Sequence, residues 1–270
     1  MRRLLLGLFL FLGFQSSAAT VDTFEVFSTA MNKSIKNIVV KPASYDSTQQ
    51  QFATVYLLHG ATGNFSDWLK KVPAIQAHAD LHQLIIVCPD GGYNSWYFDS
   101  PIDPSMQYET YISHELVQAI DSQYRTLAKR EKRAITGLSM GGHGALFLCF
   151  RHQDTFAAAG SMSGGVDLRP FPNNWNIKDR IGTYAAHPER WESYSVTNLL
   201  YLLNGKALAL IIDCGVDDFF YKINARLHDK MVERNIPHDY IERPGKHNWE
   251  YWENAVQYQL LYFKHFFGEE

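Results

Sequence analysis

The sequence contains few cysteines and no excess of positive charge. Only three of its 270 residues are cysteine, Cys88, Cys149 and Cys214. Their odd number and apolar surroundings predict buried core residues rather than a disulfide framework, and their spacing matches no metal site. The formal net charge of -3 at pH 7 lacks the basic footprint of a nucleic-acid-binding protein, so we expect no nucleic-acid partner.

Long apolar runs are also lacking once the N-terminal segment has passed. The chain opens with Met1-Arg2-Arg3, continues with an apolar run over 4–14 and ends this segment in small residues up to Ala19. This order is typical of a secretory signal peptide, and the run is shorter than the roughly 20 residues that span a bilayer. We therefore predict that 1–19 is a signal peptide cleaved after Ala19. The mature chain is then exported, periplasmic or secreted, without stable membrane insertion.

The full sequence has the composition of a globular protein, with 46% hydrophobic and 20% charged residues, and the remaining chain, 20–270, carries no internal repeat. Continuous apolar runs such as 52–58, 84–88 and 208–212 are typical of strands buried on both faces. Segments with helical spacing separate them. This alternation predicts a single α/β domain with a mostly parallel central sheet flanked by helices.

One stretch carries the strongest chemical pattern. A short β-prone run ends in Gly137-Leu138-Ser139-Met140-Gly141, and an apolar run of helix formers follows. A strand, a sharp turn bearing serine and a helix form the nucleophile elbow of an α/β hydrolase. Gly137 and Gly141 lack a Cβ where strand and helix meet, and the helix N-terminus faces the site where negative charge develops. We therefore expect Ser139 to be a nucleophile.

Two further strand ends supply partners for this serine. The loop after 52–58 begins His59-Gly60-Ala61, and its position predicts that the backbone N–H groups of Ala61 and Met140 form an oxyanion hole. Among the eleven histidines, His247 lies on a loop after the last predicted strand and ahead of the final helix, which suits a general base.

The acid of the triad is open on physical grounds. Asp213, Asp217 and Asp218 all lie near the end of the strand over 208–212, between the serine and His247 in chain order. Any of these carboxylates would hold the imidazole tautomer.

Aromatic residues cluster in two other segments. Trp96 and Tyr97 follow a glycine-rich loop at a strand end, the usual place for a site in an α/β protein. The segment 168–204 interrupts the alternation of strand and helix and contains Trp175, which predicts a small cap or lid insertion. We expect Trp96, Tyr97, Trp175 and Trp249 to contact the substrate.

Four motifs together resemble one family of serine esterases. They are Leu57-Leu58-His59-Gly60, Gly137-Leu138-Ser139-Met140-Gly141-Gly142, Cys214-Gly215-Val216-Asp217-Asp218 and Gly245-Lys246-His247-Asn248-Trp249. They are similar to the esterase D family, which includes S-formylglutathione hydrolases and tributyrin, feruloyl and acetyl-xylan esterases. The resemblance implies the α/β-hydrolase fold, Asp218 as the triad acid, and Ala61 and Met140 as oxyanion donors.

The sequence thus predicts an exported serine carboxylesterase with the triad Ser139, Asp218 and His247. Its expected substrates are short acyl or feruloyl esters, free or linked to polysaccharide, with no metal or organic cofactor. Acyl transfer through the same acyl-enzyme and thioester hydrolysis are the alternatives. The sequence leaves open whether the chain forms a homo-oligomer.

Overall fold

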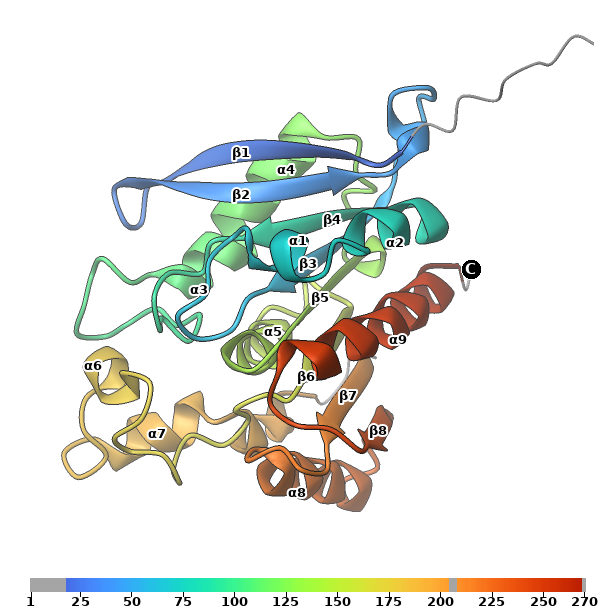
Figure 1. The fold of residues 1–270 in the computed structure, drawn as a ribbon. Helices are drawn as coiled ribbons and strands as arrows, with labels where there is room; N and C mark the ends of the chain where they lie inside the picture. Colours follow the sequence, from blue (N-terminus) through green and yellow to red (C-terminus); the bar gives the residue numbers. More distant parts are fainter. Residues whose placement is uncertain (1–17, 204–207, 269–270) are drawn as a thin grey trace, which may run out of the picture.

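The computed structural model describes residues 18–203 and 208–268, which form an eight-stranded sheet with helices on both faces (Figure 1). The strands lie in the order β1-β2-β4-β3-β5-β6-β7-β8. The pairs β1/β2 and β2/β4 are antiparallel and all later pairs are parallel. The strand bounds are β1 (Thr20–Ser28), β2 (Lys33–Lys41), β3 (Ala53–Leu58), β4 (Leu84–Pro89), β5 (Arg133–Gly137), β6 (Ala158–Met162), β7 (Ala209–Gly215) and β8 (Asp239–Arg243).

The helices alternate with these strands. Their bounds are α1 (Asp67–Lys71), α2 (Ile75–His82), α3 (Tyr108–Thr110), α4 (Val117–Gln123), α5 (Met140–Arg151), α6 (Ile177–Ile181), α7 (Pro188–Tyr194), α8 (Tyr221–Glu233) and α9 (Trp249–Gly268). A π-helical turn, η2 (Tyr111–Leu116), joins α3 to α4, and short 3₁₀ turns are η1 (Ala43–Tyr45), η3 (Arg130–Lys132), η4 (Val196–Asn198) and η5 (Leu200–Leu203).

Two apolar clusters fill the space between the sheet and its helices. One cluster contains residues of α1, α2 and α9, including Trp68, and the other contains residues of α4, α5 and α8, including Phe147. The central strands β3 and β4 are buried along their whole length, as expected for strands covered on both faces. This arrangement confirms the predicted α/β-hydrolase architecture.

Sheet register places the loops of interest at one edge. Leu58 at the end of β3 pairs with Gly137 at the end of β5, so the loop after β3 starts beside the serine turn. Met162 at the end of β6 pairs with Asp213 in β7, and Gly215 pairs with Arg243 in β8. The carboxyl ends of the parallel strands therefore gather the loops that carry Ala61, Ser139, Asp218 and His247.

Helices α2 and α3 differ in the kind of residue that they bury. The buried residues of α2 are Ile75, Ala79 and His82, whereas Leu81 is exposed. Glu109 of α3 is buried although it is charged, and Arg151 and His152 both hydrogen-bond to its carboxylate. Burial alone would raise the pKa of Glu109, but these two partners outweigh it and lower the pKa.

The segment expected to be a cap contains α6 and α7, which are labelled in Figure 1, followed by η4 and η5. We refer to 168–203, the part that the structure describes, as the insertion segment. Its first helix is anchored to the body of the protein, because Ser100 donates a hydrogen bond to the carbonyl of Arg180 at 2.6 Å. The predicted signal peptide lies outside the described residues except for Ala18 and Ala19, which come directly before β1. None of the helices within 18–203 and 208–268 is long and apolar enough to cross a membrane.

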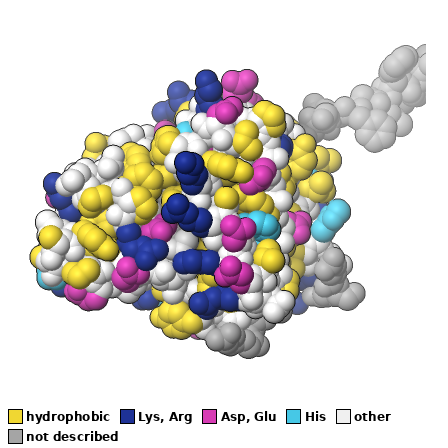
Figure 2. Space-filling view, turned by 90° about the horizontal axis from the view of Figure 1, so that it is seen from below, with side chains coloured by type: hydrophobic (Ala, Val, Ile, Leu, Met, Phe, Trp, Pro, Cys, Tyr) yellow, Lys and Arg dark blue, Asp and Glu magenta, His cyan; other side chains and the backbone are white. Residues whose placement is uncertain are grey.

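Charges of both signs lie together on the surface. Figure 2 shows a column of Lys and Arg side chains on the face viewed from below, with Asp and Glu side chains beside it. Helix α8 has this mixed character, because Lys222 and Arg226 are followed by Asp229 and Glu233. The interspersed signs agree with the small net charge and form no single-sign field on this helix.

Candidate active site

The serine turn has the strained geometry expected of a nucleophile elbow. Ser139 adopts φ 55° and ψ -116° between β5 and α5. A Cβ on Gly137 would lie 2.7 Å from the carbonyl oxygen of Leu58, and one on Gly141 would lie 2.6 Å from that of His59. These distances are too short for any side chain, so both positions require glycine if β3, β5 and α5 are to approach this closely.

A chain of hydrogen bonds runs from this serine to a buried carboxylate. His247 Nε2 lies 2.9 Å from Ser139 Oγ, and His247 Nδ1 lies 2.8 Å from Asp218 Oδ2. The other carboxylate oxygen of Asp218 accepts the N–H of Phe220 at 2.8 Å. A carboxylate bound to Nδ1–H leaves the lone pair of Nε2 directed at the serine hydroxyl, which is the arrangement needed for proton abstraction.

The other two candidate acids are directed elsewhere. Asp213 is buried, accepts a hydrogen bond from the hydroxyl of Tyr251 and pairs with Arg243. Burial raises the pKa of Asp213, although these two partners oppose the shift. Asp217 is exposed, and its backbone N–H donates to the carbonyl of Gly245 at 3.0 Å.

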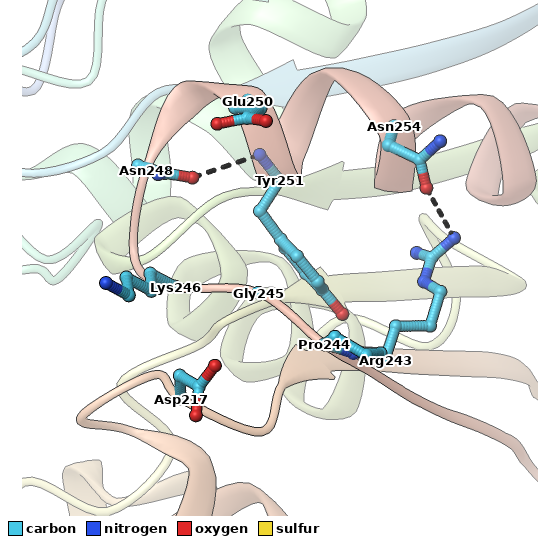
Figure 3. A pocket seen from close by; sticks show the side chains of 9 residues that line it. All are labelled: Asp217, Arg243, Pro244, Gly245, Lys246, Asn248, Glu250, Tyr251 and Asn254. Atoms are coloured by element: carbon cyan, nitrogen blue, oxygen red, sulfur yellow. Dashed lines mark hydrogen bonds between the residues drawn. The ribbon is translucent and has the colours of Figure 1, made fainter.

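Asp217 instead lines a second cavity, to which the neighbours of His247 in its loop, Lys246 and Asn248, also contribute. This cavity, of about 630 Å³, is also lined by Arg243, Glu250 and Tyr251 (Figure 3). Arg243 is already engaged, because it donates to Asn254 Oδ1 at 2.8 Å and pairs with Asp213. The second cavity is larger than the one at Ser139, but neither Ser139 nor His247 lines it.

The cavity at Ser139 has aromatic walls and a volume of about 300 Å³. Its aromatic lining residues are Trp175, Phe219, Trp249 and Trp252. Trp175 and Phe219 stack with their ring centroids 5.8 Å apart and an interplanar angle of 16°. The ring of Phe219 also lies 4.2 Å from the imidazole of His247. Such walls suit flat or apolar substrate groups, because aromatic faces favour stacked contact.

Trp96 and Tyr97 lie elsewhere than expected. Both side chains are buried, at 1% and 0% exposure, and neither lines the cavity. Both residues adopt positive φ values, 59° and 61°, which turn the loop inward. The Trp96 indole N–H donates to the carbonyl of Trp175 at 3.0 Å, and the Tyr97 hydroxyl donates to the carbonyl of His59 at 3.1 Å. They therefore support the loops around the cavity and do not form its wall.

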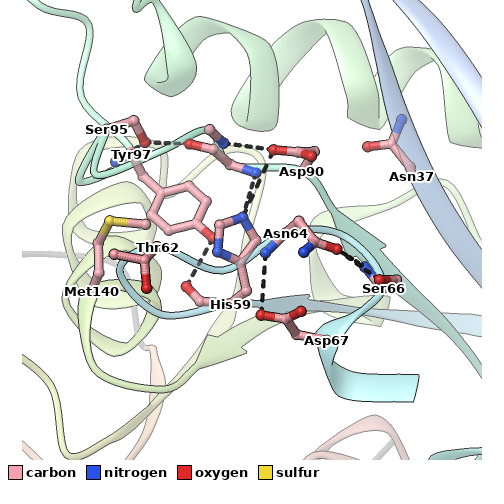
Figure 4. A network of polar contacts seen from close by, with 12 residues as sticks. Asn37, His59, Thr62, Asn64, Ser66, Asp67, Asp90, Ser95, Tyr97 and Met140 are labelled. Carbon is pink, nitrogen blue, oxygen red and sulfur yellow. Dashed lines mark hydrogen bonds and ion pairs between the residues drawn. The ribbon is translucent and has the colours of Figure 1, made fainter. Parts of the chain in front are cut away.

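His59 holds the loop after β3 in place (Figure 4). Its Nε2 accepts the backbone N–H of Gly91 at 2.8 Å, so the ring proton is on Nδ1, which lies 2.8 Å from the carbonyl oxygen of Gly60. Burial lowers the pKa of His59, although the hydrogen bond to Gly60 and the Asp90 carboxylate oppose the shift. The neutral ring thus fixes the direction of the Gly60 carbonyl.

This carbonyl direction determines where the Ala61 N–H points. In a planar trans peptide the C=O and the following N–H point in opposite directions, so the Ala61 N–H points away from the His59 ring. The next N–H groups are occupied: Thr62 donates to Asn94 Oδ1 at 3.0 Å and Gly63 to the Gly60 carbonyl at 3.2 Å. Ala61 lines the cavity together with Ser139. Met140, the first residue of α5, presents its N–H at the helix N-terminus.

No metal-binding cluster of three or more His, Cys, Asp or Glu residues is found within 18–203 and 208–268. The three cysteines are buried free thiols, as their sequence context predicted. Burial raises the pKa of Cys88 and of Cys149 to about 12.

Sequence reasoning missed several residues around this cavity. Phe219 and Trp252 line it, and His59 and Asn94 support the loop after β3. Phe219 directly follows Asp218, so its proximity to the imidazole could have been inferred. Asn94 offered no comparable pattern, since its partner Thr62 lies 32 residues away in the chain.

Fold and site together define an α/β hydrolase with a serine at its nucleophile elbow. The model of the Esterase family matches residues 28–263, and the chain belongs to this family. It is an esterase, a carboxylic ester hydrolase.

Two relatives and one solved structure indicate the range of similar proteins. The chain is similar to an acetyl esterase of Caldicellulosiruptor saccharolyticus, with 26% identity over 78% of this chain and 83% of that protein. It is also similar to the S-formylglutathione hydrolase of Rattus norvegicus, with 25% identity over 79% and 82%. A ferulic acid esterase structure has a TM-score of 0.78 and 28% identity, and the match covers 93% of this chain and 100% of that one.

Proposed function

We propose that this esterase hydrolyses short acyl or aryl esters through a triad of Ser139, His247 and Asp218. The observation that carries the proposal is the continuous hydrogen-bond chain from Ser139 Oγ through the imidazole to Asp218 Oδ2, with contacts of 2.9 and 2.8 Å. Serine is a weak nucleophile until a neighbouring base removes its proton during attack. The imidazole is placed to do so.

The first half of the reaction forms an acyl-enzyme. Ser139 Oγ attacks the ester carbonyl carbon while His247 Nε2 takes its proton, and the carbonyl oxygen becomes an oxyanion. Asp218 stabilises the resulting imidazolium and keeps its Nδ1 proton in place. The imidazolium then donates the proton to the departing alcohol oxygen as the carbon–oxygen bond breaks. A water molecule then attacks the acyl carbon while His247 Nε2 takes its proton. The imidazolium returns a proton to Ser139 Oγ as the acid is released.

The N–H groups of Ala61 and Met140 are the proposed oxyanion donors. Ala61, on the loop after β3, lines the cavity with Ser139, and Met140 directly follows Ser139 as the first residue of α5. Removing a single donor of this type typically slows turnover by about 10²- to 10³-fold, so this part of the site carries a large share of the rate enhancement.

The aromatic cavity supports a preference for planar or short acyl groups, with the insertion segment acting as a small cap over one side. Trp175 comes from this segment, and Trp249 lies at the start of α9. Acetyl and ferulic acid esters, the substrates named for two similar proteins, fit such walls. The basic and apolar N-terminal segment supports export of the enzyme, where polysaccharide-linked esters would be accessible.

A hydrolysis panel tests this proposal. Wild-type protein is assayed with nitrophenyl acetate, methyl ferulate, acetylated xylan and an acyl thioester, with Ser139→Ala as the blank. We expect Ser139-dependent hydrolysis of at least one oxygen ester. Hydrolysis of the thioester alone would favour the thioesterase alternative, and turnover that survives Ser139→Ala would refute the mechanism.

A further inference from the structure

We propose that Asn94 is a positioning residue that connects the oxyanion loop, 59–64, to the insertion segment. Its side chain accepts one hydrogen bond and donates another. Oδ1 accepts the backbone N–H of Thr62 at 3.0 Å, and Nδ2 donates to Asn176 Oδ1 at 2.8 Å. Asn94 thus holds the residue after the oxyanion donor Ala61 and the residue after the cavity-lining Trp175. The inference rests on the proposed function of the Ala61 N–H.

The backbone and side chain of Asn94 are themselves held in place. Asn94 is 3% exposed and adopts φ 49°, a left-handed conformation that asparagine tolerates better than most residues. The loop around it is fixed by neighbouring contacts. The backbone N–H of Trp96 lies 3.3 Å from Met140 Sδ, and the Tyr97 hydroxyl donates to the carbonyl of His59. A buried amide held in this way fixes the relative positions of its two partners.

The insertion segment is held at the same place by further bonds. Arg180 Nε donates to the carbonyl of Asn94 at 3.0 Å, and the Trp96 indole donates to the carbonyl of Trp175. Trp175 and Asn176 both have positive φ, 45° and 56°, so their backbone depends on surrounding contacts. The wall that contacts the substrate and the loop that stabilises the oxyanion therefore share one set of supports.

This connection has a kinetic consequence that a simple wall residue would not have. Loss of a wall contact weakens binding and raises KM, whereas displacement of an oxyanion donor lowers kcat. If Asn94 transmits position between the two regions, a change at Asn176 alters kcat even for an acetyl ester. Asn176 is exposed, and it is not among the residues that line the cavity at Ser139.

The test compares Asn94→Gly, Asn176→Gly and the double variant with wild type on nitrophenyl acetate. Glycine removes each amide while accepting positive φ, so backbone strain is not added. Asn173→Gly, at an exposed asparagine of the same segment, is the matched control. Thermal unfolding of each variant reports whether the fold is intact, and Ser139→Ala establishes that wild-type turnover depends on the serine.

We expect kcat to fall about 10- to 100-fold in Asn94→Gly, below the loss of a whole donor, with KM within about threefold of wild type. Asn176→Gly should lower kcat about 3- to 10-fold, and the double variant should resemble Asn94→Gly, because coupled residues are not additive. Asn173→Gly should match wild type.

An unchanged kcat in Asn176→Gly, or full multiplication of the two single effects in the double variant, would overturn the connection. If Asn94→Gly does not fold, the kcat of Asn176→Gly decides alone. Lack of Ser139-dependent turnover in wild type would instead overturn the proposed function.

Discussion

The two halves of the site are supported in different ways. Ser139, Asp218 and His247 follow the ends of β5, β7 and β8, and they contact one another directly at 2.8 and 2.9 Å. The oxyanion loop is held mainly by side chains, with His59 on the Gly60 carbonyl and Asn94 on the Thr62 N–H. The proposed triad thus depends on sheet register, and the proposed oxyanion loop depends on a neighbouring loop.

This difference shows where each half is sensitive to substitution. A change within the triad removes a reacting group or its direct partner, and the chemical step should collapse. A change at a supporting residue of the oxyanion loop leaves the triad intact and should weaken only the stabilisation of developing charge. The expected effects below follow this order from largest to smallest.

Substitution of the buried acid should have the largest effect. Asp218→Asn should lower kcat by about 10⁴-fold, because an amide no longer holds the Nδ1–H tautomer of His247. Asp217→Asn is the matched control and should change kcat less than about threefold, since it faces the second cavity. Steady-state kinetics with nitrophenyl acetate measure both. The reverse ranking would show that the neighbouring carboxylate is the functional one.

Loss of the imidazole that fixes Gly60 should come next. His59→Phe keeps a buried ring but removes the hydrogen bonds to Gly60 and Gly91. We expect kcat to fall about 10²-fold with little change in KM, because the Ala61 donor is displaced while the cavity walls stay in place. Rates are compared at equal fractions of folded protein. A folded variant with wild-type kcat would contradict this role of His59.

The aromatic wall should affect binding more than chemistry. Trp175→Ala removes one member of the stacked pair with Phe219. We expect KM for methyl ferulate to rise about tenfold, in line with the loss of one aromatic contact, while KM for nitrophenyl acetate changes less. Trp191→Ala would unfold the segment and is unsuitable as a control, because Trp191 is buried. Tyr184→Ala, in the same segment and partly exposed, serves instead. Equal KM changes for both esters would argue against aromatic specificity.

The smallest effect on activity is expected from substitution of His143. This substitution should instead change how stability depends on pH. Burial lowers the pKa of His143 to about 4 from the usual 6.5, so the unfolded chain binds more protons between these values. Stability should therefore fall as the pH drops from 6.5 to 4, by on the order of 3 kcal/mol from this residue. His143→Gln cannot titrate and should show a flatter decline of Tm over this window. Parallel Tm profiles for the two proteins would contradict the assignment.

Much of the placement of Ser139, Asp218 and His247 could be predicted because each residue follows a recognisable strand. The serine turn, the loop with His247 and the chain order all follow from local patterns. Local sequence pattern could not show which of the three carboxylates, Asp213, Asp217 or Asp218, contacts His247. Asp213 instead bonds to Tyr251 and Arg243, which lie 38 and 30 residues away in the chain.

The support of the oxyanion loop and the direction of the aromatic side chains could not be predicted. Trp96 and Tyr97 point inward because three residues of their loop, including Asn94, take positive φ without being glycine. No composition rule signals that conformation. The bond from Asn94 to Asn176 joins residues 82 positions apart, so it exists only through the fold. Only Trp175 and Trp249 of the four predicted aromatic residues lie on the cavity wall.

The most direct measurement is covalent labelling of the wild-type protein with a fluorophosphonate, followed by mass spectrometry of its peptides. An activated serine reacts with this probe, whereas an ordinary serine does not. We expect one adduct, on Ser139, and strongly reduced labelling in Asp218→Asn but not in Asp217→Asn. An adduct on another serine, or esterase activity that persists while Ser139 remains unlabelled, would contradict Ser139 as the nucleophile.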